Sequence, residues 1–294
     1  MNFTLCNAAL DVLQCANPIK KASRTRIHMQ NWRDGTITHI GLAPDIPARP
    51  ARPDKPELRR PNNMPKRRKA GSDKSKIALL HAIAHIELNA IDLAWDIMAR
   101  FAHYSDQNQS QDQTNSFTLP RAFFDDWIKV ADDEAKHFLM LVERLNDFGA
   151  SYGDLPAHDG LWESSQKTAH DFAARLAIVP MVLEARGLDV TPNMIVMMNK
   201  QNDDKTANML QIIHDDEVTH VRAGTRWFES WCDYHDLNIE EKWQDLVRTY
   251  FGTPLKRPFN HPSRAEAGMI RDWYEPLADI SADIILTEET TPQD

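Results

Sequence analysis

Cysteine is scarce in this 294-residue sequence, which contains three: Cys6, Cys15 and Cys232. None of them belongs to a C-x-x-C pair, so the sequence indicates neither a zinc knuckle nor a redox-active dithiol. An odd and small number of cysteines gives no disulfide framework and suits a reducing compartment. We therefore expect a cytoplasmic protein.

Long apolar runs and excess positive charge are also missing. No uninterrupted apolar stretch approaches the roughly 18 residues that a membrane span requires, and the N-terminus lacks the pattern of a signal peptide. The 34 Lys and Arg against 43 Asp and Glu give a net charge of −9 at pH 7. This balance argues against a general nucleic-acid binder. We expect no membrane partner.

Residues 1–72 form the first of three expected parts of the chain. An amphipathic pattern within residues 3–30 predicts one short helix, which Pro18 and the basic cluster at 20–26 should interrupt. Residues 41–72 carry frequent proline and many Lys and Arg, a composition typical of extended, polyproline-like chain. We expect this segment to be a strap that wraps an acidic bundle. The alternative is an arm for an anionic partner such as RNA or a phosphorylated substrate.

Residues 73–235 have the apolar periodicity of long helices, and we expect them to form a four-helix bundle. Asp73 is the expected N-cap of the first helix. A polar loop over residues 105–116 follows it. Pro120 then marks the start of the second helix, which should end near Gly149.

The second half of this region is less regular. A connection over residues 150–160 should precede a third helix, in which Pro180 kinks or opens the backbone and Gly187 marks the end. Thr191-Pro192 has the residues that favour a helix start, so we expect another helix there. The polar run at 201–204 should break it before the last long helix.

Residues 236–294 form the third expected part. Two short helical patterns occur near residues 239–251 and 263–274. The last fifteen or so residues are acidic, and we expect a frayed tail. The predicted fold class is therefore all-α: a ferritin-like four-helix bundle with an N-terminal Pro/Arg-rich strap and extra short helices.

A five-residue pattern, D-E-x-x-H, occurs at residues 133–137 and again at 216–220. Positions i and i+3 share one face of a helix, so the Glu and the His of each copy can bind one metal ion. Glu87 and Glu184 interrupt the apolar stripes of two other helices, where an uncompensated buried carboxylate is costly. This order is that of a di-iron or di-manganese site in a ferritin-like bundle. The expected ligands are Glu87, Glu134, His137, Glu184, Glu217 and His220.

The aspartate before each of these glutamates has an expected supporting role. It lies about 100° from the Glu around the helix and can accept the second N–H of a metal-bound histidine on another helix. We expect Asp133 to pair with His220, and Asp216 with His137. The alternative for the whole pattern is a set of coincidental ion pairs on solvated helix faces.

Other polar residues near the pattern have more ordinary expected roles. His85 lies about 160° around the helix from Glu87, so we expect His81 and His85 to face the strap or a neighbouring helix. Tyr104 and Tyr152 are expected at surface or loop positions, with a redox role as the alternative.

Four segments resemble the DUF455 family of ferritin-like proteins: HAIAHIELNAIDLAWD (81–96), DDEAKHF (132–138), LEARGLDVTP (183–192) and DDEVTHVRAGTRWF (215–228). The basic runs RPARPDKP (49–56) and RRKAG (67–71) are similar to that family as well. The resemblance implies the same six ligands and a broad kinship with the tRNA-modifying MiaE hydroxylases and other carboxylate-bridged di-iron proteins. It implies a fold and leaves the reaction and the substrate open.

We expect an O₂-activating oxidoreductase that hydroxylates or desaturates an unknown organic substrate with the help of an electron donor. Its expected cofactor is two Fe ions, with Mn as the alternative, because a carboxylate-rich site with one imidazole per metal suits these metals better than Zn. One alternative function is iron oxidation, iron storage or peroxide handling. Another is a tRNA-modifying hydroxylase whose strap holds RNA, which the net charge of −9 does not favour.

Overall fold

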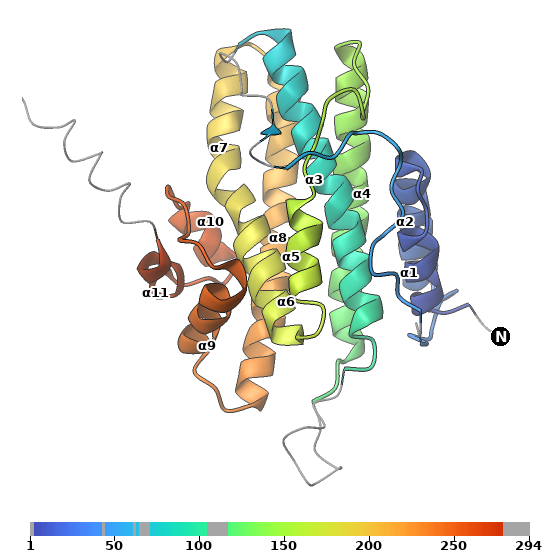
Figure 1. Ribbon diagram of the computed structural model, residues 1–294, viewed down its shortest axis with the longest axis vertical. Coiled ribbons are helices and arrows are strands. Elements are labelled where there is room, and N and C mark those ends of the chain that lie inside the picture. The colour runs from blue at the N-terminus through green and yellow to red at the C-terminus, as the bar shows by residue number, and fades with distance from the viewer. Residues whose placement is uncertain (1–2, 43–44, 61–62, 65–70, 105–116, 279–294) are drawn as a thin grey trace, which may run out of the picture. The chain divides into compact units, whose positions relative to one another are not determined.

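Helices make up the regular structure of this protein (Figure 1). The computed structural model describes residues 3–42, 45–60, 63–64, 71–104 and 117–278, and within these ranges it contains two isolated β-bridges but no strand. The predicted all-α helical bundle class is confirmed. The chain divides into two compact units, residues 1–175 and residues 176–294. The boundaries expected after residues 72 and 235 remain predictions.

The first unit is built on two long antiparallel helices that lie side by side, α3 (Asp73–Arg100) and α4 (Arg121–Asp147) (Figure 1). The N-cap of α3 is Ser72, whose hydroxyl accepts a hydrogen bond from the backbone N–H of Ser75. The predicted N-cap, Asp73, is therefore wrong by one residue, because a capping box forms between the two serines.

The start of α4 directly after Pro120 is as predicted. At its other end the chain leaves the helix through Gly149, whose φ of 68° lies in the left-handed region that favours glycine. The predicted polar loop at 105–116 lies outside the described residues.

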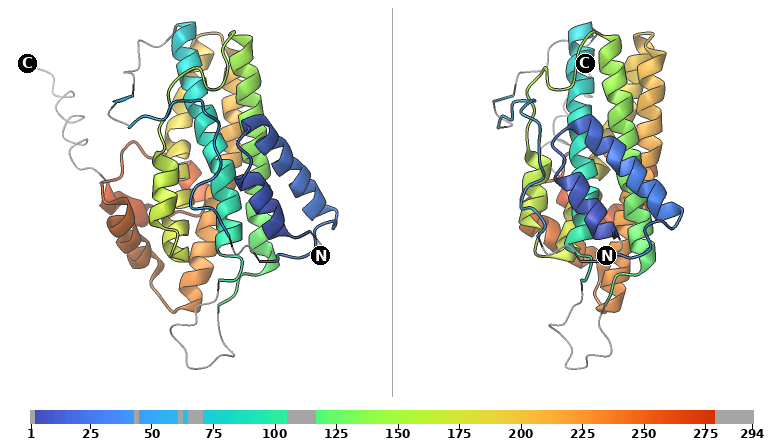
Figure 2. Two further views of the ribbon diagram at one scale, coloured as in Figure 1. Left: turned by 45° about the vertical axis from the view of Figure 1, so that its right-hand side comes forward. Right: turned by 90° about the vertical axis from the view of Figure 1, so that its right-hand side faces the viewer.

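Two helices precede the strap where the sequence predicted one: α1 (Leu5–Leu13) and α2 (Pro18–Arg33). The prediction was wrong because Pro18 starts a helix here. Proline fits the first helical turn, where its missing N–H has no intrahelical partner to lose. The Asn17 side chain caps this start by accepting a hydrogen bond from Lys20 N–H. The basic cluster therefore lies within α2, and α1 and α2 pack against α3 and α4 (Figure 2).

The described part of the strap, residues 45–60, contains no helix, as predicted. Ion pairs connect it to other parts of the first unit. The Arg49 guanidinium lies 2.5 Å from Asp159, and Arg52 lies 2.8 Å from Asp92. These residues are thus extended and paired with acidic side chains of the first unit, and the wrapping of an acidic bundle remains a prediction. The basic residues 66–69 lie outside the described part of the chain.

The second unit contains another antiparallel helix pair, α7 (Ala185–Lys200) and α8 (Asp204–Tyr234) (Figure 1). The break predicted at residues 201–204 separates them. There Asn202 takes a positive φ of 53°, and the side chain of Asp203 caps α8 by accepting from the backbone N–H of Thr206.

The chain before α7 differs from the prediction. α6 (Phe172–Ile178) continues through a π-helical segment, Val179–Glu184, directly into α7. Pro180 lies in that segment, so the predicted disturbance of the backbone is confirmed. The predicted stop at Gly187 and the predicted start at Thr191-Pro192 are wrong, because α7 runs through both. Packing of α7 against α8 overrides these local preferences.

The remaining helices are short. α5 (Gly160–Lys167) lies within the connection from α4 to α6. In the tail, α9 (Ile239–Leu246) continues as a π turn over Val247–Phe251, and α10 (His261–Glu266) and α11 (Arg271–Tyr274) divide the second predicted pattern in two. The predicted acidic tail lies outside the described residues.

One helix, α3, is long and apolar enough to cross a membrane by length and composition alone. This is weak evidence, because the core helix of a soluble protein passes the same test. Of the apolar 18-residue window of α3, 67% is buried within the protein. α3 is therefore a core helix of the first unit.

Candidate metal centre

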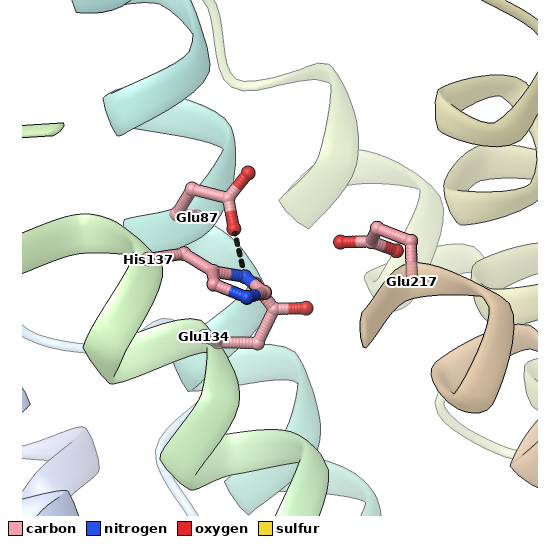
Figure 3. Close-up of side chains that lie close together, drawn as sticks. All are labelled: Glu87, Glu134, His137 and Glu217. Carbon is pink, nitrogen blue, oxygen red and sulfur yellow. Dashed lines mark hydrogen bonds and ion pairs between the residues drawn. The ribbon is translucent and has the colours of Figure 1, made fainter. Parts of the chain in front are cut away.

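Three side chains of ligand type meet in the first unit: Glu87 of α3, and Glu134 and His137 of α4 (Figure 3). One ligand atom of each lies within 4.8 Å of the others. His137 Nδ1 is 3.0 Å from Glu87 Oε2 and 3.7 Å from Glu134 Oε2. The structure thus brings together the three residues that the apolar stripes of α3 and α4 placed on inward faces.

The position of this triad follows from the pattern around it. On α3, Glu87 falls between Ala84 and Ile91, and on α4 Glu134 falls between Ala131 and Phe138. All four of these apolar neighbours are fully buried. Residues at i±3 and i±4 share a helix face, so each glutamate occupies a place in the core that an apolar side chain would normally fill.

Burial destabilises the charged forms of the three side chains in the triad. Glu87 is 3% exposed, and Glu134 and His137 are 0% exposed. Burial, and then the neighbouring charge of Glu134, raise the pKa of Glu87 well above its ordinary value, while His137 acts in the opposite direction. Two carboxylates this close disfavour each other's charged form. A bound cation would relieve both the desolvation and the repulsion, so the donor set fits a metal ion.

The hydrogen bond between His137 and Glu87 uses atoms that a metal would need. Nδ1 of His137 must be deprotonated to act as a ligand, so metal binding through this atom and its hydrogen bond to Glu87 exclude each other. A metal bound through Nδ1 would replace this hydrogen bond, whereas a metal bound through Nε2 would leave it in place.

The second unit carries a similar group of residues. Glu217, also labelled in Figure 3, and His220 are buried on α8, with His220 Nδ1 3.7 Å from Glu217 Oε1. Glu184 is half-buried and is the last residue of the π-helical segment, which packs against α8. The three predicted ligands of this half thus lie on two neighbouring elements.

The π-helical segment approaches α8 closely at a glycine. A side-chain Cβ at Gly224 would lie 2.4 Å from Pro180 Cγ, well inside van der Waals contact. Gly224 is one turn beyond His220 on α8, and Pro180 is one turn before Glu184. The absence of a side chain at Gly224 therefore lets α8 and the π-helical segment pack together.

The two aspartates with expected supporting roles are also on α4 and α8. Asp133 is bonded by Lys129 and Lys136, which lie one turn away on either side of it on α4. The expected pairing of Asp133 with His220, and of Asp216 with His137, remains a prediction.

The histidines on the other side of α3 hold a loop, and His85 also lies near the strap, whose Arg52 is the next cause after burial that lowers the pKa of His85. His81 Nε2 accepts a hydrogen bond from Gly153 N–H at 2.9 Å, and His85 Nδ1 lies 2.8 Å from the Tyr152 hydroxyl. Burial lowers the pKa of His85 to about 3, so the imidazole is neutral. Tyr152 has the predicted loop position, where its ring packs edge-on against Phe138.

Sequence reasoning missed a buried ionic cluster on α3, little more than a turn beyond Glu87. Asp92 is 0% exposed and is bonded by Lys21 of α2 and by Arg52 of the strap. Arg52 also donates to the side chain of Asn89 at 2.6 Å. The only sequence signal was an aspartate in the apolar run NAIDLAW, which does not identify partners 71 and 40 residues away. This cluster fastens α3 to the N-terminal helices and the strap.

An all-α fold with a buried carboxylate–histidine cluster defines the class of this protein. Residues 14–275 match a family described as "Protein of unknown function (DUF455)", so the chain belongs to that family, as predicted. An uncharacterized protein of Haemophilus influenzae (strain ATCC 51907 / DSM 11121 / KW20 / Rd) is 39% identical over 227 residues, which cover 76% of each chain. No solved structure matches. The ferritin-like assignment stays a prediction.

Proposed function

We propose that the two halves described above form one dinuclear iron centre, and that the protein is an O₂-activating oxidoreductase acting on an organic substrate. The observation that carries this proposal is the buried triad of Glu87, Glu134 and His137. The second Glu-x-x-His pair, on α8, supports two metal positions. In this proposal the two helix pairs pack as a four-helix bundle with their ligands facing inward.

The chemistry of the donors favours iron, with manganese as the alternative. The six proposed ligands offer carboxylate oxygens and two imidazoles but no thiolate, which is a set that suits Fe or Mn better than Zn. Such a metal, when bound, supplies the one-electron and O₂ chemistry that protein side chains lack. Hydroxylation and desaturation are the reaction types that we propose.

The residues of the chain have three tasks in this function. The carboxylates neutralise the metal charge, and Glu87 must be ionised to do so. His137 would hold the metal through a deprotonated ring nitrogen, and its other ring nitrogen could keep a hydrogen bond to a carboxylate. The buried apolar neighbours on α3 and α4, such as Ile91 and Phe138, keep water away from the first half of the site and so strengthen the electrostatic interactions within it.

The RNA-modifying alternative receives less support from the strap. Arg49 and Arg52 are engaged with Asp159 and Asp92, so in the described part these two arginines already bond carboxylates of the same chain. The localisation that we propose is the cytoplasm. The three cysteines are free and buried, and burial raises the pKa of Cys6 to about 11 and of Cys232 to about 12.

The test is metal analysis of the full-length protein purified without oxygen, followed by an optical spectrum after O₂ is added. We expect two irons per chain and a transient visible absorption. Zinc alone, with no response to O₂, would contradict it. Sustained Fe(II) oxidation or peroxide consumption without any organic substrate would favour the alternative of iron or peroxide handling.

A further inference from the structure

A groove in the first unit lies between the C-terminal half of α2 and the N-terminal half of α4. Its volume is about 480 Å³, within the range of roughly 300–1,000 Å³ that is typical of small-molecule sites. Its lining residues are Met29, Trp32, Arg33, Arg121, Asp125, Ile128 and Lys129. The ligands proposed for the metal centre are not among them.

The lining combines an apolar base with a positively charged edge. Trp32 and Ile128 are buried, and Met29 is half-buried. The three cations, Arg33, Arg121 and Lys129, are exposed. A ligand seated here would meet apolar surface below and guanidinium or ammonium groups beside it.

The one carboxylate in the groove, Asp125, is already engaged. Its Oδ1 accepts a hydrogen bond from Trp32 Nε1 at 2.7 Å and lies 3.7 Å from Arg121 Nε. These contacts fix the indole. Lys129 is paired with Asp133, so the positive charge of the lining comes from Arg33 and Arg121 against Asp125. The groove therefore has a net positive charge in a protein whose net charge is −9.

The cations of α2 differ in their pairing. Lys21, Arg24 and Arg26 are paired with Asp92, Asp11 and Asp132, whereas Arg33 lines the groove. A concentration of one sign of charge around a recess with low-dielectric walls raises the local concentration of oppositely charged ligands. An anion is thus the kind of ligand that this face attracts.

The stacking of Arg121 on Trp32 adds a geometric preference. The guanidinium carbon of Arg121 lies 3.9 Å from the centroid of the indole ring, so the two planar groups form a flat, preformed platform. Planar apolar groups pack well against such a surface, and a guanidinium matches carboxylate and phosphate geometry.

We propose that this groove binds a flat organic anion, an aromatic ring system that carries a carboxylate or a phosphate. The rings lie on the Arg121 guanidinium that covers Trp32, beside Met29, and the anionic group is bound by Arg33. This site is independent of the metal centre and of the function proposed for it.

The first experiment is isothermal titration calorimetry of the full-length protein with naphthoate, naphthyl phosphate and the neutral naphthylmethanol. We expect saturable 1:1 binding of at least one anion, and binding of the neutral compound about tenfold weaker, because the neutral compound cannot form charge-assisted hydrogen bonds. The tighter of the two anions identifies carboxylate or phosphate as the preferred group. Equal binding of the neutral compound, or no binding of either anion, would overturn the proposal.

Variants locate the site. Arg121→Ala removes the platform and should weaken anion binding at least tenfold. A matched control is Arg226→Ala, because Arg226 also lies over a tryptophan, 4.8 Å from the ring of Trp227, on α8. We expect the control to bind the anions as the wild type does. Equal losses in both variants would refute the assignment to this groove.

A second variant guards against a folding defect. Arg33 makes no hydrogen bond or ion pair within the described part of the chain, so Arg33→Ala changes the charge of the groove without removing a structural contact. Its binding of the same anion should weaken several-fold with an unchanged circular dichroism spectrum. Wild-type affinity in this variant would contradict the proposed role of Arg33.

Discussion

The two units hold their ligand-bearing helices by different means. In the first unit, α3 is fastened by buried charges: Asp92 is bonded by Lys21 and Arg52. In the second unit, α8 is positioned by close packing, with Gly224 against Pro180 of the π-helical segment. Buried ion pairs are sensitive to the loss of one charge, whereas close packing is sensitive to added volume. The same Glu-x-x-His pattern thus depends on different physical interactions in each unit.

The largest expected effect concerns the ligands themselves and tests whether both units contribute equally. Glu134→Ala in the first unit and Glu217→Ala in the second should each remove metal binding at one position. We expect metal analysis of anaerobically purified protein to give at most one iron per chain for either variant.

Glu143→Ala provides the control, since Glu143 is an exposed residue of α4, and it should retain two irons. A Glu134 or Glu217 variant that keeps two irons would refute its assignment as a ligand. Loss confined to Glu134→Ala would reduce the site to the first unit alone.

The next largest effect is expected in the charge-fastened unit. Asp92→Ala leaves Lys21 and Arg52 without their buried carboxylate, and such a loss costs about 3–5 kcal/mol. The free energy of unfolding, measured by urea denaturation, should fall by that amount. Asp245→Ala removes an exposed carboxylate that pairs with Arg248 and should change stability by less than about 0.5 kcal/mol. Similar values for the two variants would contradict the role of the buried cluster.

A smaller effect is expected from added volume in the second unit. Gly224→Ala places a methyl group against Pro180 and should lower the free energy of unfolding by about 1–3 kcal/mol. Gly187→Ala is the matched control, because Gly187 lies on α7 with no atom within 4 Å of its missing Cβ. That change should stabilise the protein by about 0.5–1 kcal/mol. If Gly224→Ala is neutral, close packing does not position α8.

The smallest expected effect is a pH dependence in the first unit. The pKa of His85 is lowered to about 3 from 6.5, mainly by burial, so below pH 6.5 the unfolded chain binds a proton that the folded chain does not. Stability due to the neutral imidazole is thus present above pH 6.5 and is lost as the pH falls, by roughly 1 kcal/mol between pH 6.5 and 5.5.

Urea denaturation at both pH values checks this expectation. His85→Gln should lose that part of the pH dependence, whereas His39→Gln, a change at an exposed histidine, should keep it. An unchanged slope in His85→Gln would show that another group is responsible.

The difference between the two units also explains which parts of the structure could be predicted from the sequence. The positions of Glu87, Glu134 and His137 were predictable because straight α-helices follow a period of 3.6 residues, and α3 and α4 are straight enough to keep it. The Asp92 cluster was not predictable, because its partners come from distant segments that only the tertiary fold brings close. In the second half, Glu217 and His220 lie on the α-helix α8 and follow the same period, whereas Glu184 ends a π-helical segment, where the helical period changes.

Local signals were also overridden where packing decided the outcome. Gly187 indicated a helix end and Thr191-Pro192 a helix start, yet α7 continues through both against α8. By contrast, Pro18 indicated an interruption and instead starts a helix, because Asn17 caps it. Each of these residues is compatible with more than one local structure, and the surrounding contacts determined which structure formed.

The π-helical segment has a sequence pattern that can be used to search for related chains. The apolar stripe of the third helix takes two successive steps of four residues, from Leu176 to Pro180 to Glu184. In a regular α-helix two such steps drift by about 80° around the axis, whereas the wider i→i+5 turns of a π-helix reduce that drift. Two four-residue steps across an internal proline, ending on glutamate, are therefore a search pattern. A template with an unbroken α-helix at residues 172–200 would misorient the carboxylate of Glu184.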